Sequence, residues 1–272
     1  MTGPLVSLLS DFGLRDPSAA IMRGVVLSIA PDARIVDISH EVRKFAIRDG
    51  ALLLWCALPY LPVGAHVAVV DPGVGTARLP VAIEAARGDV LVGPDNGLLV
   101  AAATKLGGIV AVHVLEAEAY RLPVVSTSFH GRDLFAPAAA HLALGVPIAE
   151  LGRALDPAAL VPSPIREPDV LAGELRSSIV YVDTFGNVKL AGLRTDLEDA
   201  LGPVRAGDRI RLTVAGRDRI ETTWQTTFGE VEPGETLLYE DSYRRICLAA
   251  SQADAATKLG LVEDLEVTIR RA

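Results

Sequence analysis

The chain has 272 residues, half of them hydrophobic and 5% aromatic, with a formal net charge of −8 at pH 7. This length allows two domains with full cores. The acidic balance and the absence of a long charge run argue against nucleic-acid binding and against an anionic membrane surface. No apolar stretch is long enough to span a bilayer, and the N-terminus lacks a signal-peptide pattern.

The two cysteines, Cys56 and Cys247, lie in apolar runs far apart in the sequence. This placement predicts two buried thiols in a protein of the reducing cytoplasm. No Cys/His spacing resembles a metal site, so no metal ligand is expected.

Strands and helices are expected to alternate over roughly the first 150 residues. The expected strands are Leu5–Leu9, Arg34–Ile38, Ala65–Val70, Val81–Ile83, Asp89–Val92 and Ile109–Val114. The expected helices are Pro17–Ile29, with Asp16 as N-cap, Ala46–Leu58, Leu98–Thr104, and one following Asp133 that runs to Leu144. Alternation of this kind predicts an α/β domain with a doubly wound, mostly parallel sheet.

The character of the chain changes near Asp156, where four prolines within the next twelve residues indicate an extended linker. Short β-rich segments follow, at Leu175–Val182, Asn187–Leu190, Arg209–Val214, Arg219–Trp224, Thr236–Tyr239, Arg245–Ala249 and Leu265–Ile269. One helix is expected, at Gln252–Leu259. The pattern predicts an all-β domain, a small antiparallel barrel or sandwich. We therefore divide the chain into domains 1–160 and 161–272.

The loop after the strand Ala65–Val70 carries Asp71 and Arg78 around two glycines. Ligands of open α/β sheets bind beyond the carboxyl ends of the strands, and glycines let a ligand approach the backbone closely. An acid and a base in this place indicate a reaction centre. The same residues also fit a surface turn, with Asp71 as its initiator and Arg78 solvated.

Polar loops also follow other strands, at Ser10-Asp11, Asp95-Asn96 and His130–Asp133. If these loops gather at one sheet edge, Asp, Arg and His side chains together can hold a water molecule, orient it and manage its proton. His130 alone reads equally as a helix-start or core histidine. We interpret His66, His113 and His141 as structural and leave the role of His40 open.

Other chemistries find little support. Gly73-Val74-Gly75 after a strand is typical of dinucleotide loops, but the third glycine is missing and Arg78 stands where a small residue is needed. Neither a GxxxxGK phosphate loop nor a GxSxG nucleophile motif occurs. In the second domain, the segment 182–187 contains Phe185, which could stack on a purine, and Asn187, whose amide could read a base edge. An ordinary β-turn explains the same residues.

Five motifs in order resemble the S-adenosylmethionine hydroxide adenosyltransferase family, which is related to the fluorinase and chlorinase enzymes. They are SDFG, VVDPGVGTAR, GPDNGLL, FHGRDLFAPAAAHLA and VDTFGNV, and they extend over nearly the whole chain. The resemblance implies hydrolysis of S-adenosyl-L-methionine to adenosine and L-methionine by water or hydroxide attack at the ribose C5′. Methionine leaves as a neutral thioether, so the resemblance implies neither a metal nor a cofactor.

The resemblance assigns the water-holding set to Asp71, Arg78 and His130. In the halogenating relatives the first and third of these positions hold other side chains. Because the negative charge of Asp71 opposes a halide anion, we expect hydrolysis rather than halogenation.

The resemblance also assigns the substrate-binding residues and the assembly. Asp11 matches a ribose contact, and Asp16 and Ser18 match the methionine side. The remaining matches are Phe45, Phe129, Asp183, Phe185, Asn187, Phe228 and Ser242. The first domain is then the catalytic and ribose-binding domain, and the second is a β-barrel-like domain that binds adenine and methionine. A homotrimer with active sites between subunits is implied as well.

The segment Asp241-Ser242-Tyr243-Arg244 departs from the Asn-Ser-x-Gly pattern of the family. Arg244 or Arg245 is a candidate partner for the methionine carboxylate there. Three alternatives stay open: a halide-dependent adenosyl transferase that makes 5′-halo-5′-deoxyadenosine, a non-catalytic protein that binds S-adenosylmethionine or adenosine because this segment has lost productive geometry, and, more remotely, a dinucleotide-binding enzyme.

Overall fold

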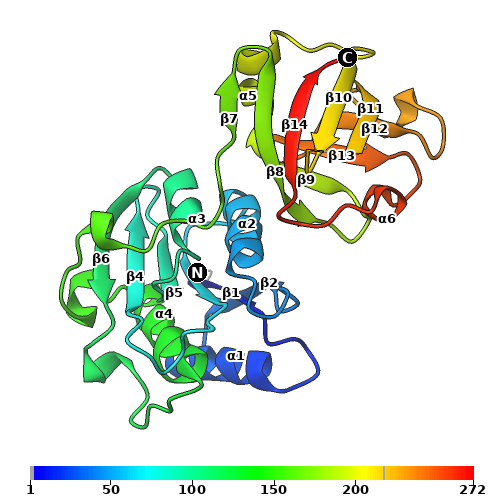
Figure 1. The fold of residues 1–272 in the computed structure, drawn as a ribbon. Coiled ribbons are helices and arrows are strands. Elements are labelled where there is room, and N and C mark those ends of the chain that lie inside the picture. Colours follow the sequence, from blue (N-terminus) through cyan, green and yellow to red (C-terminus); the bar gives the residue numbers. More distant parts are fainter. Residues whose placement is uncertain (1–2, 217) are drawn as a thin grey trace. The chain divides into compact units, whose positions relative to one another are not determined.

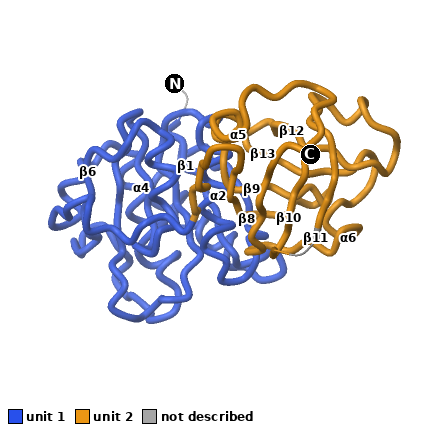
Figure 2. The backbone as a smooth tube through the Cα atoms, turned by 45° about the horizontal axis from the view of Figure 1, so that its top comes forward, with its two compact units in different colours: residues 1–164 blue, residues 165–272 orange. Residues whose placement is uncertain are grey.

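The computed structural model describes residues 3–216 and 218–272. The chain divides into two compact units, residues 1–164 and 165–272 (Figure 2). Each unit has its own hydrophobic core.

The first unit is built on a six-stranded sheet in the order β2-β1-β3-β5-β4-β6 (Figure 1). Its strands are β1 (Leu5–Ser10), β2 (Arg34–Ser39), β3 (Ala65–Val69), β4 (Pro80–Ala85), β5 (Val90–Pro94) and β6 (Ile109–Val114). The first four strands in this order pair in parallel, whereas β4 is antiparallel to both of its neighbours. The sheet is therefore mixed. The turn between β4 and β5 is too short for the crossover that a parallel pair requires.

Two pairs of helices pack on this sheet. The pairs are α1 (Ser18–Ile29) with α4 (Ala136–Ala143), and α2 (Ile47–Ala57) with α3 (Val100–Lys105). The first pair shares a core with Val6 and Leu8 of β1. Gly50 of α2 lies against Leu9 of the same strand. Because successive strand residues face opposite sides of a sheet, the two pairs cover opposite faces, and the α/β prediction is confirmed.

The start of α1 corrects one prediction. Asp16 was expected to be the N-cap with Pro17 in the first helical turn. Instead Pro17 is the N-cap residue, the helix begins at Ser18, and no side chain caps it. The proline ring restricts φ to values near the −74° seen here, so the backbone is already set for the helix that follows, without a capping carboxylate.

The second unit is a closed barrel. Its strands are β7 (Asp169–Leu171), β8 (Glu174–Val182), β9 (Val188–Leu193), β10 (Arg209–Val214), β11 (Asp218–Trp224), β12 (Thr236–Glu240), β13 (Arg245–Ala250) and β14 (Glu266–Arg271). The β14–β8 pairing closes a ring of seven strands, and β7 lies outside the ring beside β8. All pairs are antiparallel except β11 with β12. The barrel form of the prediction is confirmed.

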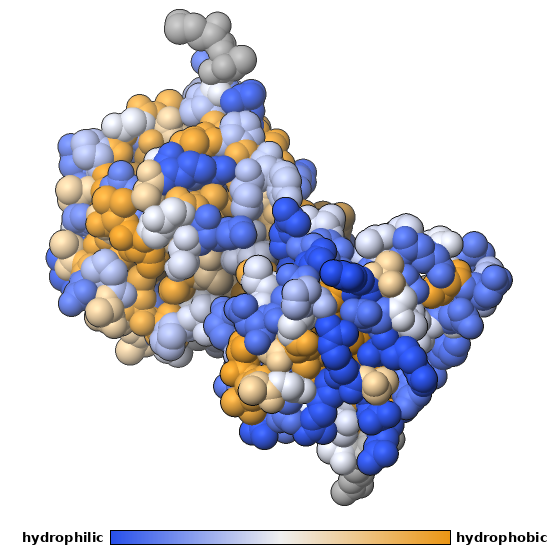
Figure 3. Space-filling model, turned by 90° about the horizontal axis from the view of Figure 1, so that it is seen from above, coloured by the Kyte–Doolittle hydropathy of each residue, from blue (hydrophilic) through white to orange (hydrophobic). Residues whose placement is uncertain are grey.

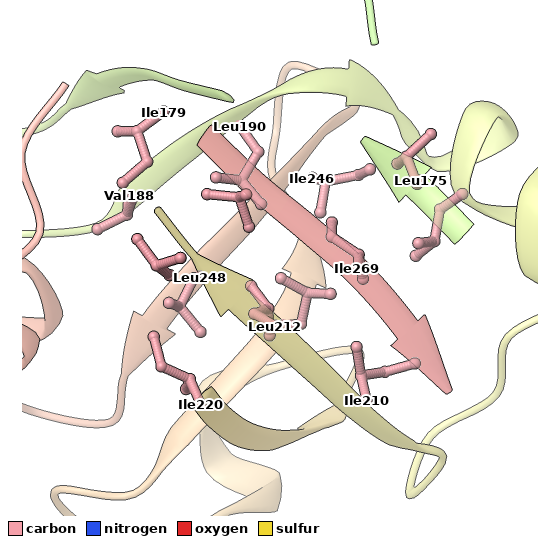
Figure 4. Close-up of a cluster of buried hydrophobic side chains, with 14 of the residues drawn as sticks. Leu175, Ile179, Val188, Leu190, Ile210, Leu212, Ile220, Ile246, Leu248 and Ile269 are labelled. Carbon is pink, nitrogen blue, oxygen red and sulfur yellow. The ribbon is translucent and has the colours of Figure 1, made fainter. Parts of the chain in front are cut away.

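The barrel interior is filled by aliphatic side chains, including Ile179, Leu190, Leu212, Ile246 and Ile269 (Figure 4). The α-helices among the described residues of this unit are α5 (Arg194–Leu201), which the sequence pattern did not predict, and α6 (Ala255–Leu259), which is shorter than expected. The sequence pattern also did not predict β7, which directly follows the proline-rich linker.

The face drawn in Figure 3 is mixed, with hydrophobic areas lying beside hydrophilic ones. Large exposed hydrophobic side chains include Phe45 and Phe185, which are 69% and 78% exposed. Cys56 and Cys247 are buried and form no disulfide.

Candidate active site

The loop after β3 is held by its own turns. Asp71 accepts a backbone hydrogen bond from Val74 at 3.2 Å, and the Thr76 hydroxyl donates to the Gly73 carbonyl at 2.7 Å. Gly75 has φ +77°, and a Cβ there would lie 2.5 Å from the carbonyl oxygen of Thr127. Only glycine permits both the backbone conformation and this close approach. The β3 loop therefore packs against the segment that leads to His130.

Asp71, Arg78 and His130 form one hydrogen-bonded group. The Arg78 guanidinium binds both carboxylate oxygens of Asp71, with Nε donating to Oδ1 at 3.1 Å and Nη2 donating to Oδ2. Arg78 Nη2 also donates to His130 Nδ1 at 3.0 Å. The side chains of Arg78 and Asp71 are 6% and 4% exposed. The loop is thus an ordered ion pair joined to a histidine, not a solvated turn.

These contacts determine the state of His130. A guanidinium can only donate hydrogen bonds, so Nδ1 must accept and the proton of the neutral ring lies on Nε2. Burial, followed by the positive charge of Arg78, lowers the pKa of His130 below its ordinary 6.5. The ring is therefore neutral at pH 7, with its proton on Nε2.

Asp133 holds the segment that carries His130. It is fully buried, and its Oδ2 accepts hydrogen bonds from the backbone N and the hydroxyl of Ser126 at 2.8 and 2.7 Å. The Ser126 hydroxyl in turn accepts from Phe129 N at 3.0 Å. Burial raises the pKa of Asp133, but the hydrogen bonds from Arg132 and Ser126 outweigh it and lower the pKa overall. A single π-helical turn, Gly131–Phe135, then leads into α4.

A cavity of about 360 Å³ lies beside this group. Its walls are Asp11, Phe12, Lys44, Phe45, Val69, Asp71, Val74, Ser128, Phe129, His130 and Gly131. The loops after β1, β2 and β3 and the segment before α4 therefore meet at one place. Of the predicted residues, Asp11, Phe45, Asp71, Phe129 and His130 line this cavity.

Asp11 is buried and oriented by the loop after β2. Its Oδ2 accepts a hydrogen bond from Phe45 N at 2.9 Å, and Phe45 adopts a left-handed φ of +66°. Lys44 Nζ donates to the carbonyl oxygens of Asp11 and Phe12 at 2.7 and 3.1 Å. Asp11 therefore keeps one carboxylate oxygen, Oδ1, for a ligand hydroxyl group.

His40, which the sequence left open, supports the loop after β1. Its Nδ1 contacts the Ser10 hydroxyl at 2.7 Å, and its Nε2 contacts Asp37 Oδ1 at 3.1 Å. The three residues have the chemistry of an acyl-transfer triad, but Ser10 is fully buried and cannot meet a substrate. His66 makes the same pattern with Ser7 and Asp89. Both sets are structural.

Asp95 and Asn96 also support the site rather than line it. Asn96 Nδ2 donates to the carbonyl of Val70, just before Asp71, at 2.9 Å. Asp95 Oδ1 accepts from Val161 N at 2.9 Å. Asp16 and Ser18 do not line the cavity beside His130, so their assignment to the methionine side stays a prediction.

The barrel unit has a cavity of about 710 Å³. All the residues predicted to bind substrate in this unit line it, namely Asp183, Phe185, Asn187, Phe228 and Ser242. The other lining residues, which no sequence motif marks as ligand contacts, are Lys189, Tyr239, Asp241, Tyr243, Ala250, Gln252 and Ala253. Aromatic rings and carboxylates thus line the same cavity, which suits a ligand that combines a flat heterocycle with a positively charged group.

The turn 183–187 is self-supporting. Asp183 Oδ1 accepts from the backbone N of Phe185 and of Asn187, at 2.9 and 3.0 Å, and Oδ2 accepts from Asn187 Nδ2 at 3.0 Å. The Asn187 amide therefore uses a donor within the turn and offers Oδ1 to a ligand. Gly186 is required because a Cβ would lie 2.0 Å from Asp254 Oδ1.

The structure does not place Arg244 or Arg245, the candidate partners of the methionine carboxylate, at the barrel cavity. Arg244 is exposed and pairs with Glu240, while Arg245 is buried, and neither lines the barrel cavity. Within residues 3–216 and 218–272, no three His, Cys, Asp or Glu side chains are grouped as metal ligands would be. In the same residues, no helix has the length and apolarity to cross a membrane.

Both units of the chain match domains of one known protein family. Residues 6–152 match the N-terminal domain of the SAM hydroxide adenosyltransferase family, and residues 177–268 match its C-terminal domain. The chain belongs to this family.

Its relatives include an (R)-S-adenosyl-L-methionine hydrolase from Salinispora tropica, 42% identical over 95% of this chain and 94% of that protein. A fluorinase from an Actinoplanes species is more distant, 29% identical over 99% of this chain and 98% of its own length. The crystal structure of an uncharacterized conserved protein from Thermotoga maritima matches with a TM-score of 0.91 at 32% identity, covering 98% of this chain and 100% of the other.

Proposed function

We propose that this family member hydrolyses S-adenosyl-L-methionine to adenosine and L-methionine. The observation that carries the proposal is the buried Asp71–Arg78–His130 group at the wall of a cavity that also contains Asp11. The hydrolase relative is also more similar to this chain than the fluorinase relative is.

In the proposed reaction, a water molecule donates a hydrogen bond to Asp71 and accepts one from His130 Nε2–H. Its remaining lone pair faces C5′ of the ribose. Arg78 orients the Asp71 carboxylate by binding both of its oxygens and holds His130 in the Nε2–H tautomer. The group therefore fixes the direction of the attacking lone pair, which is the contribution that an in-line displacement needs most.

The bond changes balance without a further reactant. The water oxygen forms a bond to C5′ while the C5′–S bond breaks. The electron pair of the C5′–S bond goes to sulfur. The sulfonium becomes the neutral thioether of methionine, and water loses a proton through Asp71 to solvent. A sulfonium is a good leaving group, so His130 need not act as an acid.

Substrate contacts divide between the two cavities in this proposal. Asp11 Oδ1 accepts hydrogen bonds from the ribose hydroxyls, because Oδ2 is already bound by Phe45 N. In the barrel cavity, Phe185 and Phe228 stack on adenine, Asn187 Oδ1 accepts from its amino group, and Asp183 attracts the methionine ammonium. Ser242 binds the methionine carboxylate.

We further propose a homotrimer in which the substrate meets the first unit of one subunit and the barrel unit of the next. This rests on the family resemblance and on the division of the predicted contacts between two units. Light scattering measures the mass of the assembly and so tests whether it is a trimer. Mixing Asp71→Ala with Asn187→Ala subunits tests the sharing, since mixed trimers regain intact sites only if each site draws on two subunits.

A product assay tests the function. The purified protein is incubated with each sulfonium epimer of S-adenosylmethionine, with and without chloride. We expect adenosine and methionine, independent of chloride, from the (R) epimer for which the relative is named. A 5′-halo product would instead identify a halide-dependent transferase, and tight binding without product would identify a binding protein.

A further inference from the structure

Lys189 is the one cation among the described residues that line the barrel cavity. It comes from β9, beyond the turn that carries Asp183 and Asn187, and its side chain is 10% exposed. A lysine in a strand would ordinarily reach solvent, so a nearly buried one at a cavity wall requires a partner.

The partner is Asp241, which begins the turn between β12 and β13. Lys189 Nζ donates to Asp241 Oδ2 at 2.5 Å. Asp241 Oδ1 accepts from the backbone N of Tyr243 and of Arg245, at 2.8 and 2.9 Å. The same carboxylate thus shapes the turn that presents Ser242 and anchors the ammonium beside it.

Lys189 retains capacity for a ligand. An ammonium has three N–H donors, of which Asp241 takes one, and the ring of Tyr243 lies 5.2 Å from Nζ. Burial lowers the pKa of Lys189, but the hydrogen bond to Asp241 and nearby negative charges outweigh it and raise the pKa overall. The ammonium is therefore protonated at neutral pH. An anionic group in the cavity would find both the Lys189 ammonium and the Ser242 hydroxyl in its lining.

The charges of the cavity select the kind of ligand. Asp183 and Asp241 are each negative and Lys189 is positive, so together these three carry a net charge of −1. An amino-acid sulfonium, with an ammonium, a carboxylate and the sulfonium centre, has the opposite net charge of about +1 at neutral pH. Complementary net charge favours the sulfonium substrate over its neutral products.

We propose that Lys189, together with Ser242, binds the α-carboxylate of the substrate and makes that carboxylate a requirement for efficient turnover. This inference rests on the proposed function and adds a specificity-determining residue to it. It replaces Arg244 and Arg245 as the cation for that group, because neither of them lines the cavity.

The test compares S-adenosylmethionine with the same compound lacking its carboxylate. Wild-type protein should prefer the carboxylate form by at least about 10- to 100-fold in kcat/KM, the effect of one or two hydrogen bonds to a charged group. Lys189→Met alone leaves Asp241 buried without its cation and can impair folding. The decisive variant is therefore the double change Lys189→Met with Asp241→Asn, which removes both charges together.

The double variant should lose about 10- to 100-fold in kcat/KM on the carboxylate form and little on the other form. The matched control is Asp241→Asn alone, which keeps the ammonium and should keep the preference. Circular dichroism and Tm confirm that each variant is folded. If the double variant keeps the wild-type preference, Lys189 does not bind the carboxylate. If it loses rate equally on both compounds, its role is only structural, and the proposal fails.

The role of Lys189 can be tested even if the proposed hydrolase function proves wrong. If wild-type protein forms no product from S-adenosylmethionine, calorimetric binding of the two compounds to the same variants tests Lys189 without turnover. A preference for the carboxylate form that the double variant loses supports the proposal. Equal binding of both forms by wild-type protein, or binding of neither, overturns it.

Discussion

Arg78 donates a hydrogen bond through Nη2 to His130 Nδ1 at 3.0 Å, while the same guanidinium binds Asp71. His130 is consequently fixed as a neutral ring with its proton on Nε2. In the proposed mechanism, His130 donates a hydrogen bond to water, and Asp71 accepts the proton of the water. The cation between them orients both groups.

The first prediction concerns the titration of His130. Because burial and the charge of Arg78 lower its pKa, the neutral form should persist below pH 6.5, the ordinary value. Adenosine formation should be constant above that pH and fall as the pH drops through the lowered pKa. Nitrogen-15 NMR of His130 at pH 7 should show the Nε2–H tautomer.

Changing Arg78→Met should raise the pKa of His130 relative to wild-type protein, because a neighbouring positive charge is removed. Arg121→Met is the control, since Arg121 pairs with Glu118 and does not contribute to the pKa of His130. An unchanged His130 titration in the Arg78 variant would show that the guanidinium does not control the ring.

The second prediction is that Asp71→Asn lowers kcat by about 100-fold or more, the usual contribution of a proton-accepting group. The amide keeps the shape of the carboxylate but cannot accept a proton from water. Calorimetric affinity for S-adenosylmethionine should change less than about tenfold, because the lost interaction belongs to the transition state. Asp199→Asn, at an exposed position on α5, should behave as wild type. Equal losses in kcat and in affinity would assign Asp71 to binding.

The third prediction concerns Gly75. Gly75→Ala adds a left-handed alanine and places a Cβ 2.5 Å from the Thr127 carbonyl, so it should push the His130 segment away from Arg78. Gly145→Ala is the matched control, because Gly145 has φ +93° and nothing within 4 Å of its Cβ position. The control should lose only about 1 kcal/mol of stability and keep its activity. The Gly75 variant should lose more stability and most of its turnover. Similar behaviour of both variants in thermal unfolding and turnover would contradict this account.

The fourth prediction concerns Asp133. Its pKa is lowered in the folded protein, so its contribution to stability is present above its ordinary pKa of 3.8 and is lost as the pH falls through the lowered value. Asp133→Asn should cost about 2 kcal/mol at pH 7, as expected for hydrogen bonds to a buried charge, and progressively less near pH 3. Urea unfolding at both pH values measures the difference. A cost that does not depend on pH would mean that the charge of Asp133 contributes nothing.

The strands were predictable where burial and β-branching coincide, as in Ala65–Val69, which precedes the Asp71 loop. The order of elements therefore predicted an α/β unit followed by a β unit. Helix α5 was missed because Arg194–Leu201 is mostly polar and buries only Leu197 and Ala200. The N-cap at Asp16 was wrong because a residue type that favours capping need not occupy the capping position.

In the site, the sequence placed Asp71 and Arg78 in one loop, but their contact with His130 depends on Gly75 meeting Thr127 across the fold. Lys189 and Asp241 are 52 positions apart, and no local sequence pattern around either residue predicts that they form a pair. Only the closure of β9 against β13 brings them together. His40 was likewise undecidable, because its partners Ser10 and Asp37 belong to two different strands.

The most direct test of the central claim, that the Asp71–Arg78–His130 group delivers water to C5′, is a reaction run in oxygen-18 water. Mass spectrometry should find one oxygen-18 atom in adenosine, located in the 5′-hydroxyl group, and none in methionine. Asp71→Asn should suppress formation of this labelled product. Adenosine without label at the 5′ oxygen, or unchanged labelling and rate in the variant, would contradict the account.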